Sequence, residues 1–166
     1  MKKHLIQSYR ILQNIENAYP YLSLIANNIT IIYLVKKKYL KAFRYVQAGL
    51  MKMEAVFFKN LKENKKNAYF LDILMILLQG YLNYACCLNN LKKLEDEIED
   101  EEIVAIIRNK EAKIFYKNGL KLARKFLEQN NKMLKKFEYL SHNYEEIKKK
   151  SEVPQMIVKK EFKLKS

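Results

Sequence analysis

The feature that most constrains the fold of this chain is a long apolar run at residues 67–90, NAYFLDILMILLQGYLNYACCLNN. Its central part, residues 69–88, has about the twenty residues that a helix needs to cross a bilayer. The run also contains Asp72, Gln79 and Asn83, whose polar groups are costly in lipid. A helix that is apolar all round in a soluble domain is normally wrapped by its neighbours. We therefore expect a buried central helix, and a small membrane protein that spans at 69–88 is an alternative.

Turn-forming residues are scarce, with three glycines and two prolines in 166 residues. Sheets need such residues every few positions, so the composition favours an all-α fold. The chain is 49% hydrophobic and long enough to bury the core of one domain. We expect a single helical domain at 1–154, followed by a short basic tail at 155–166.

The spacing of apolar residues predicts six or seven helices. We expect them at about 3–18, 20–35, 37–62, 69–88, 102–130 and 131–150. Pro20 and Pro154 mark two boundaries, because proline disfavours helix at the residue before it. Asn67 is a candidate N-cap of the apolar helix. The acidic run EDEIEDEE at 95–102 is expected to form a solvated corner whose carboxylates favour the start of the next helix.

The formal net charge is +14, and nearly all of the positive charge is lysine. Clustered cations gain affinity for nucleic acid by releasing counterions, but bidentate contacts to phosphates and bases favour arginine. The abundance of lysine together with asparagine, isoleucine and tyrosine indicates a coding bias. A basic helical nucleic-acid-binding accessory protein remains an alternative, and it predicts that the lysines gather on one face.

Residues that could carry reaction chemistry are few. His4 lies near the N-terminus, and His142 shares a helix face with Glu138, which is too few ligands for a metal ion. Neither a glycine-rich phosphate loop nor a nucleophile elbow occurs. Cys86 and Cys87 are adjacent, and neighbouring helical positions cannot easily close a disulfide. We expect a non-enzymatic protein with no catalytic residues, no metal site and no cofactor.

Two of the expected helices resemble each other when Gly49 and Gly119 are aligned. Both have an aromatic residue four positions back, a leucine one position ahead, and apolar residues four, seven and eight positions ahead. The two glycines lie 70 residues apart, about twice the period of a tetratricopeptide repeat. Gly80 lies mid-helix between them. A helical glycine costs about 1 kcal/mol relative to alanine, so these glycines suggest close approach of neighbouring backbones. The pattern predicts an irregular, tetratricopeptide-like stack of antiparallel helical hairpins.

Four segments, in order, resemble motifs of the T component family associated with TRAP transporters (TatT-like). They are a helical hairpin at about 38–70, YLNYACCL at 81–88, EAKIFYKNGLKLARKFLE at 111–128 and KKSEVP at 149–154. The positions in register with the family, or marked by the glycine pattern, are Gly49, Gly80, Tyr84, Ala85, Ala112, Tyr116, Gly119, Ala123, Leu127, Glu128, Val153 and Pro154.

The resemblance implies a non-enzymatic periplasmic scaffold that associates with the solute-binding subunit of the transporter and with itself. It also implies a concave or central surface for a protein or a small apolar solute. The N-terminus shows neither a signal peptide nor a lipid-bearing cysteine, so a cytoplasmic location is expected if the chain begins at Met1. Tyr81, Tyr84 and Tyr116 are candidate pocket-lining residues. For Tyr84 and Tyr116 we favour the alternative of core packing.

Overall fold

The computed structural model describes residues 1–15, 18–63 and 69–149. Within these ranges the regular elements are helices, so the predicted all-α stack of antiparallel hairpins is confirmed. In chain order the elements are α1 (Lys2–Leu12), α2 (Tyr19–Val35), α3 (Tyr39–Lys62), α4 (Phe70–Lys92), the 3₁₀ turn η1 (Glu95–Glu97), α5 (Glu101–Asn109), α6 (Ala112–Phe126), α7 (Lys132–His142) and the single turn α8 (Tyr144–Ile147).

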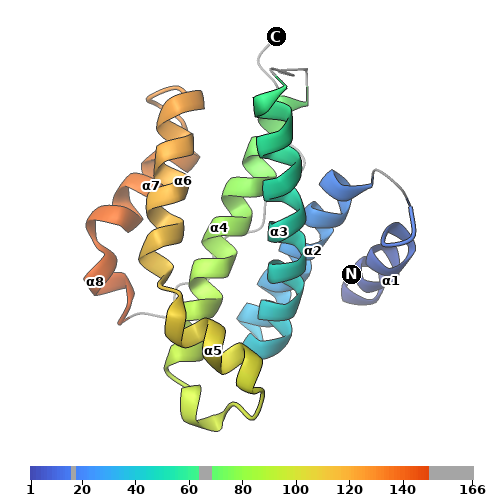
Figure 1. Cartoon of the computed structure of the whole chain (residues 1–166), viewed down its shortest axis with the longest axis vertical. Coiled ribbons are helices and arrows are strands. Elements are labelled where there is room, and N and C mark those ends of the chain that lie inside the picture. Colours follow the sequence, from blue (N-terminus) through green and yellow to red (C-terminus); the bar gives the residue numbers. More distant parts are fainter. Residues whose placement is uncertain (16–17, 64–68, 150–166) are drawn as a thin grey trace.

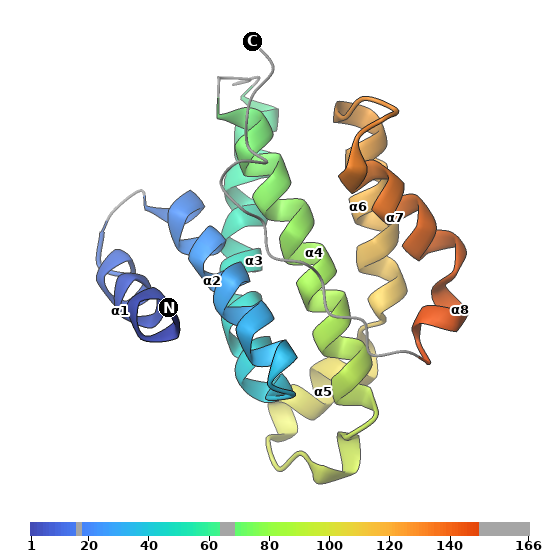
Figure 2. The ribbon, with the colours of Figure 1, turned by 180° about the vertical axis from the view of Figure 1, so that it is seen from behind.

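Helix α4 is the central element of the bundle (Figures 1 and 2). It packs against α2 and α3 on one side and α6 on the other, and α5 crosses one end. Helix α1 lies on the outer side of α2, and α7 packs on α6. Every residue from 76 to 91 is buried, as expected for the apolar run. The fold therefore encloses α4 between two sets of hairpins.

Helices α3 and α6, which pack on α4, are amphipathic, and their apolar stripes are buried in the core. In α3 the buried positions recur at intervals of three and four residues, the spacing of one helix face. Helix α6 repeats this spacing with smaller residues. Because α3 and α6 both pack on α4, the two segments that resemble each other in sequence occupy corresponding positions on its two sides.

The expected single helix at 102–130 is wrong, because the chain breaks at Lys110 and Glu111 into α5 and α6. Both residues are extended, with φ/ψ of −116°/134° and −107°/135°. Ile107 and Ala112 are both buried, yet five residues of continuous helix would turn their side chains about 140° apart. The break allows α5 to cross the end of the bundle while α6 lies along its side (Figure 1).

Two further helix boundaries also differ from the sequence prediction. The first helix ends at Leu12 instead of 18, where the Asn14 side-chain amide donates to the Arg10 carbonyl at 3.2 Å. The expected helix at 131–150 is interrupted at Asn143, whose side chain donates to the Tyr139 carbonyl at 3.0 Å. In both places an asparagine side chain bonds a terminal carbonyl of the helix, which competes with continued helix.

Side-chain caps fix the starts of α5 and α7. The Asp100 carboxylate accepts the N–H of Ile103 at 3.2 Å, so the acidic run does favour the start of a helix. Asn131 accepts the N–H of Met133 at 2.8 Å in the same way. The expected cap Asn67 and the tail at 155–166 lie outside the described residues.

Candidate functional site

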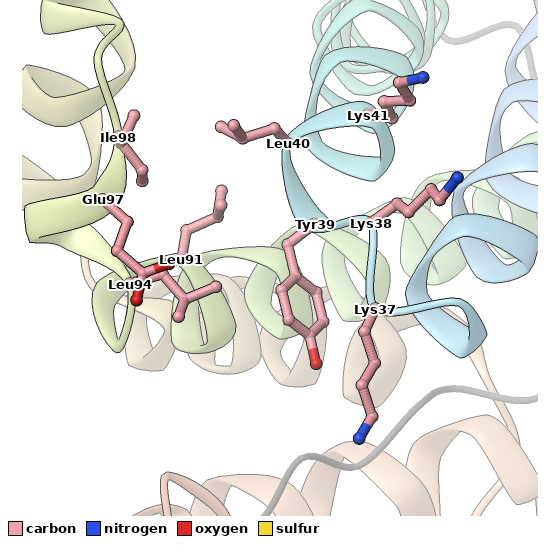
Figure 3. A pocket seen from close by; sticks show the side chains of 9 residues that line it. All are labelled: Lys37, Lys38, Tyr39, Leu40, Lys41, Leu91, Leu94, Glu97 and Ile98. Atoms are coloured by element: carbon pink, nitrogen blue, oxygen red, sulfur yellow. The ribbon is translucent and has the colours of Figure 1, made fainter.

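An open groove lies at one end of the bundle, where two corners of the chain meet (Figure 3). One wall is the α2–α3 corner, and the other is the segment that leads from α4 through η1 towards α5. The groove has a volume of about 340 Å³, and we call it the end groove. Its lining residues are Lys37, Lys38, Tyr39, Leu40, Lys41, Leu91, Leu94, Glu97 and Ile98.

The α2–α3 corner is a Schellman turn with a lysine where glycine is the usual residue. Helix α2 ends at Val35; the N–H of Lys37 then donates to the Leu34 carbonyl at 2.9 Å, and the N–H of Lys38 donates to the Tyr33 carbonyl at 2.8 Å. This pattern requires a left-handed residue, and Lys37 has a φ of 54°. Because that conformation strains an L-residue, the rim of the end groove holds a strained lysine.

The floor of the end groove is apolar. Leu91 is fully buried at the end of α4, and Leu40, Leu94 and Ile98 are half-buried around it. In Figure 3 the side chains of Leu40, Leu91 and Ile98 converge on the open space, whereas the ammonium groups of the lysines point out of it. The groove therefore offers a small hydrophobic surface within a charged rim.

The two walls of the end groove carry opposite charges. Lys37, Lys38 and Lys41 lie on the α2–α3 side, and Glu97 lies on the other side, within the acidic run 95–102. Within the described residues none of these four side chains forms an ion pair. The rim therefore presents cations on one side and a carboxylate on the other, all available to a partner.

Two carboxylates of the acidic run are already neutralised within the fold. Arg44 of α3 pairs with Asp100 at 3.5 Å, and Arg108 of α5 pairs with Glu95. These contacts attach the acidic corner to the helices on either side of it. The acids between them, Asp96, Glu97 and Glu99, form no ion pair with another described residue.

Gly49 and Gly80 have different kinds of neighbour. A Cβ atom on Gly49 would lie 3.0 Å from the Ala26 Cβ and 3.6 Å from the Ser23 Cα, so the backbones of α2 and α3 approach closely there. The Ser23 hydroxyl also donates to the Gly49 carbonyl at 3.0 Å. A Cβ atom on Gly80 would lie 3.1 Å from the Leu50 Cδ1, the end of a flexible side chain. The close approach of backbones is thus found at the first glycine, and a side chain fills the space at the second.

The α6 positions that carry the family resemblance lie mostly in the core. The Phe137 ring of α7 occupies the space that a Cβ atom on Gly119 would need, and Tyr116 packs against Tyr144 with ring centroids 6.0 Å apart. The other buried positions in register with the family are Tyr84, Ala85, Ala112 and Ala123. Leu127 is half-buried and Glu128 is exposed. Val153 and Pro154 lie outside the described residues.

Tyr81 and Tyr84 are buried between α3 and α6. The Tyr81 hydroxyl donates to the Glu54 carboxylate at 2.7 Å, and burial together with that carboxylate raises the pKa of Tyr81. The Tyr84 ring lies 4.6 Å from that of Phe115, and its buried hydroxyl has no hydrogen-bond partner among the described residues. Burial, more than the nearby charges of Cys87 and Glu54, raises the pKa of Tyr84 to about 12. Neither tyrosine lines the end groove, and nor does Tyr116.

The polar residues of the apolar run are used in packing α4 against α2. The Asn27 amide donates to the Ile76 carbonyl at 3.0 Å, and the Asn83 amide donates to the Asn27 side-chain oxygen at 3.3 Å. Gln79 donates to the Asn83 side-chain oxygen at 3.0 Å. We call these three side chains, Asn27, Gln79 and Asn83, the amide network. A buried amide is costly unless it is hydrogen-bonded, and here each one is.

Other candidate chemistry is dispersed. His142 is exposed and its Nδ1 lies 2.8 Å from the Glu138 carbonyl oxygen. Among the described residues, no three histidine, cysteine or acidic side chains converge as a metal site. Cys86 and Cys87 are buried free thiols, and burial raises the pKa of Cys87. A buried thiol with a raised pKa is a poor nucleophile, because the thiolate is the reactive form.

Helix α4 is long and apolar enough to cross a membrane, and it is the one described helix that meets that test. In this fold, 83% of its most apolar 18-residue window is buried. Asp72 lies in its first turn, where desolvation raises the pKa of the carboxyl. The amide network explains how the other polar residues of the run are accommodated inside a helical core.

Sequence reasoning missed the end groove, although its parts were visible. The run VKKKYLK at 35–41 and the acidic run at 95–102 are both prominent, but the sequence alone predicts only a solvated corner for the acidic run. Only the fold shows that these two corners face each other across Leu91. No family model, curated protein or solved structure matches this chain, so the site is defined by its own geometry.

Proposed function

We propose that this chain is a non-enzymatic helical scaffold that binds another protein, the role implied by its resemblance to the T component associated with TRAP transporters. The observation that carries the proposal is the end groove, with its apolar floor and charged rim. Protein interfaces combine these two features, an apolar centre that excludes water and a polar edge. An anchor side chain from a partner could fill the space between Leu40, Leu94 and Ile98.

The shape of the end groove supports protein binding over catalysis. Its polar residues are lysines whose ammonium groups point away from the floor, and one carboxylate. None of these lies beside a histidine or a thiol that could act with it. The two buried thiols and the amide network belong to the packing of α4. The groove therefore suits recognition of a surface.

The test is a titration of the full chain with the purified solute-binding subunit of a TRAP transporter from the same organism. We expect saturable one-to-one binding in calorimetry. Leu94→Glu should weaken it by at least about tenfold, because a carboxylate then replaces part of the apolar floor. Met51→Glu is the control, since Met51 is exposed on α3 and does not line the groove. Absence of binding, or equal binding by Leu94→Glu, would overturn this proposal.

A second candidate function, nucleic-acid binding, is favoured by one specific observation. Helix α6 carries five cations and no carboxylate, namely Lys113, Lys117, Lys121, Arg124 and Lys125. Four of them recur at intervals of four residues, so they form a row with steps of about 6 Å along the helix axis. Such a row suits a phosphate backbone, since neutralising phosphates releases counterions.

This candidate is tested by measuring the affinity for single-stranded RNA and duplex DNA over a series of salt concentrations. Lys117→Glu/Lys121→Glu should reduce the slope of log affinity against log salt by about two, one for each lost contact. Lys37→Glu/Lys38→Glu, with the same change of charge at the end groove, should leave the slope less affected. Affinity that is undetectable even at low salt would eliminate the candidate.

A further inference from the structure

The charges on the rim of the end groove have a consequence for the kind of partner that fits it. A partner surface of one sign would be attracted by one wall and repelled by the other, because Lys37, Lys38 and Lys41 lie on the wall opposite Glu97. A fitting surface must therefore carry both signs in the opposite order. A second copy of the chain, rotated by a two-fold axis through the groove, presents that arrangement.

The backbone at Lys37 gives a second reason to regard the lysine wall as functional. Among the described residues, Lys37 is the one non-glycine residue with a positive φ, at 54°. A glycine would adopt this left-handed conformation without strain. Strain of this kind is often retained where a side chain has a role. The corner could turn with glycine, so the lysine supplies something other than the turn, and its charged side chain is exposed at the rim.

We propose that the end groove is the contact surface of a two-fold symmetric dimer of this chain. In this dimer the lysine wall of each copy (Lys37, Lys38 and Lys41) lies against the acidic run around Glu97 of the other copy. The apolar floors of both copies pack against each other at the axis through Leu40, Leu94 and Ile98. This inference rests on the proposed function, in that both require the groove to be a protein-binding surface.

The dimer is expected to be weak and dependent on salt. Its apolar centre is small, and its ion pairs lie at an exposed rim, where screening over about 10 Å at 0.1 M salt reduces them. Sedimentation velocity of the full chain should therefore show a concentration-dependent dimer at about 50 mM salt. The dimer should weaken by about tenfold or more at about 500 mM salt.

Charge exchange provides the decisive experiment. Lys37→Glu/Lys38→Glu gives the lysine wall a net negative charge, with Lys41 unchanged, and Glu97→Lys/Glu99→Lys reverses the charge of the opposite wall at those two positions. Each variant alone should therefore be monomeric. Mixed in equal amounts they should form a heterodimer, because every wall then meets the opposite sign. Circular dichroism of each variant establishes that it is folded. Lys117→Glu/Lys121→Glu, with the same charge change on α6, should dimerise like the parent chain.

Lys37→Gly separates the side chain from the backbone. It relieves the left-handed strain, so the variant should melt at the same or a higher temperature, and yet it should dimerise less well because it loses a rim cation. A purely structural role for Lys37 would leave dimerisation unchanged.

Three results would overturn the dimer: a monomer at every salt and protein concentration, an unaltered dimer in Lys37→Glu/Lys38→Glu, or no association in the mixture. These results differ from failure of the proposed function. A chain that stays monomeric but binds the solute-binding subunit through Leu94 keeps the proposed function and loses the dimer. A chain that dimerises but does not bind the subunit keeps the dimer and loses the transporter partnership.

Discussion

At the scale of single residues, the three glycines of the core have neighbours that differ in how freely they can move. Gly119 faces the ring of Phe137, which is fully buried. Gly49 faces the Ala26 Cβ and the Ser23 Cα of α2, and Gly80 faces the end of the Leu50 side chain. A side chain added at Gly119 therefore meets a buried ring. One added at Gly49 meets α2 at close range, and one added at Gly80 meets the flexible end of Leu50.

These neighbours predict a ranking of glycine substitutions. Gly119→Ala should destabilise the fold by roughly 1–3 kcal/mol, because the buried ring must shift. Gly49→Ala should cost less, and Gly80→Ala should be neutral or stabilising, since alanine gains about 1 kcal/mol of helix propensity. Gly80→Leu should cost roughly 1–3 kcal/mol by overpacking. Urea denaturation checks the order, and an equal effect at Gly119 and Gly80 would contradict it.

The buried hydroxyl of Tyr84 predicts a dependence of stability on alkaline pH. Its pKa is raised from 10.0 to about 12 by burial, so between these values the folded chain keeps a proton that the unfolded chain has lost. The free energy of unfolding therefore contains a contribution that is complete below pH 10 and falls as the pH rises towards 12.

Tyr84→Phe removes this contribution, so its stability relative to the parent chain should increase as the pH rises from about 9 towards 11. Denaturation curves of both chains across this range provide the comparison, and the other tyrosines affect both chains equally. A stability difference that stays constant over the whole range would show that Tyr84 does not titrate differently in the folded state.

At the scale of elements, the amide network explains how α2 and α4 find a single alignment. A shift of one helix along the other by one turn would separate Asn27 from Asn83 and leave buried amides without partners. The apolar contacts between the helices are less selective, because many leucines and isoleucines are interchangeable. The network therefore supplies specificity of alignment between two helices that are otherwise largely apolar.

This account predicts strong coupling between Asn27 and Asn83. Asn83→Ala should cost about 1–3 kcal/mol, since it removes the donor to the Asn27 side-chain oxygen and the acceptor for the Gln79 amide N–H in the core. Asn27→Ala/Asn83→Ala should cost less than the sum of the single changes, with a coupling of about 0.5–3 kcal/mol. A double-mutant cycle measured by chemical denaturation gives this value. Additive effects would show that the two side chains act independently.

The sequence predicts some elements better than others, for physical reasons. The helices α2, α3 and α4 have unbroken apolar stripes and are predicted to within a few residues. The break between α5 and α6 contains neither glycine nor proline, and its one signal is the five-residue step from Ile107 to Ala112. The end groove could not be predicted, because Leu40 and Leu94 belong to segments that only the packing of α3 against α4 brings together.

At the scale of the whole molecule, charge and apolar surface are separated in space. The acids of the run 95–102 lie at the end of the bundle where α5 crosses, while α6 presents cations along its length. The most apolar helix, α4, is enclosed at the centre. The surface of the molecule is therefore charged. Helix α4, the one described helix that is long and apolar enough to cross a membrane, is buried inside it.

Enclosure of α4 predicts how the intact chain partitions on cell fractionation. We expect the full-length protein in the supernatant without detergent, because α2, α3, α5 and α6 shield α4 from solvent and lipid. Ultracentrifugation of a lysate, followed by immunodetection, provides the measurement. Recovery only from carbonate-washed membranes would favour the alternative in which residues 69–88 span the bilayer.

The corner between α5 and α6 makes the shape of the molecule sensitive to a deletion. Removing Lys110 would bring Ile107 and Ala112 into step on one helical face. The two segments could then continue as a straight rod of about 25 residues, nearly 40 Å long. A rod of that length would project past the bundle and could exchange its end with that of a neighbouring molecule. One residue at this corner, Lys110, thus decides whether α5 turns across the end of the bundle or continues in line with α6.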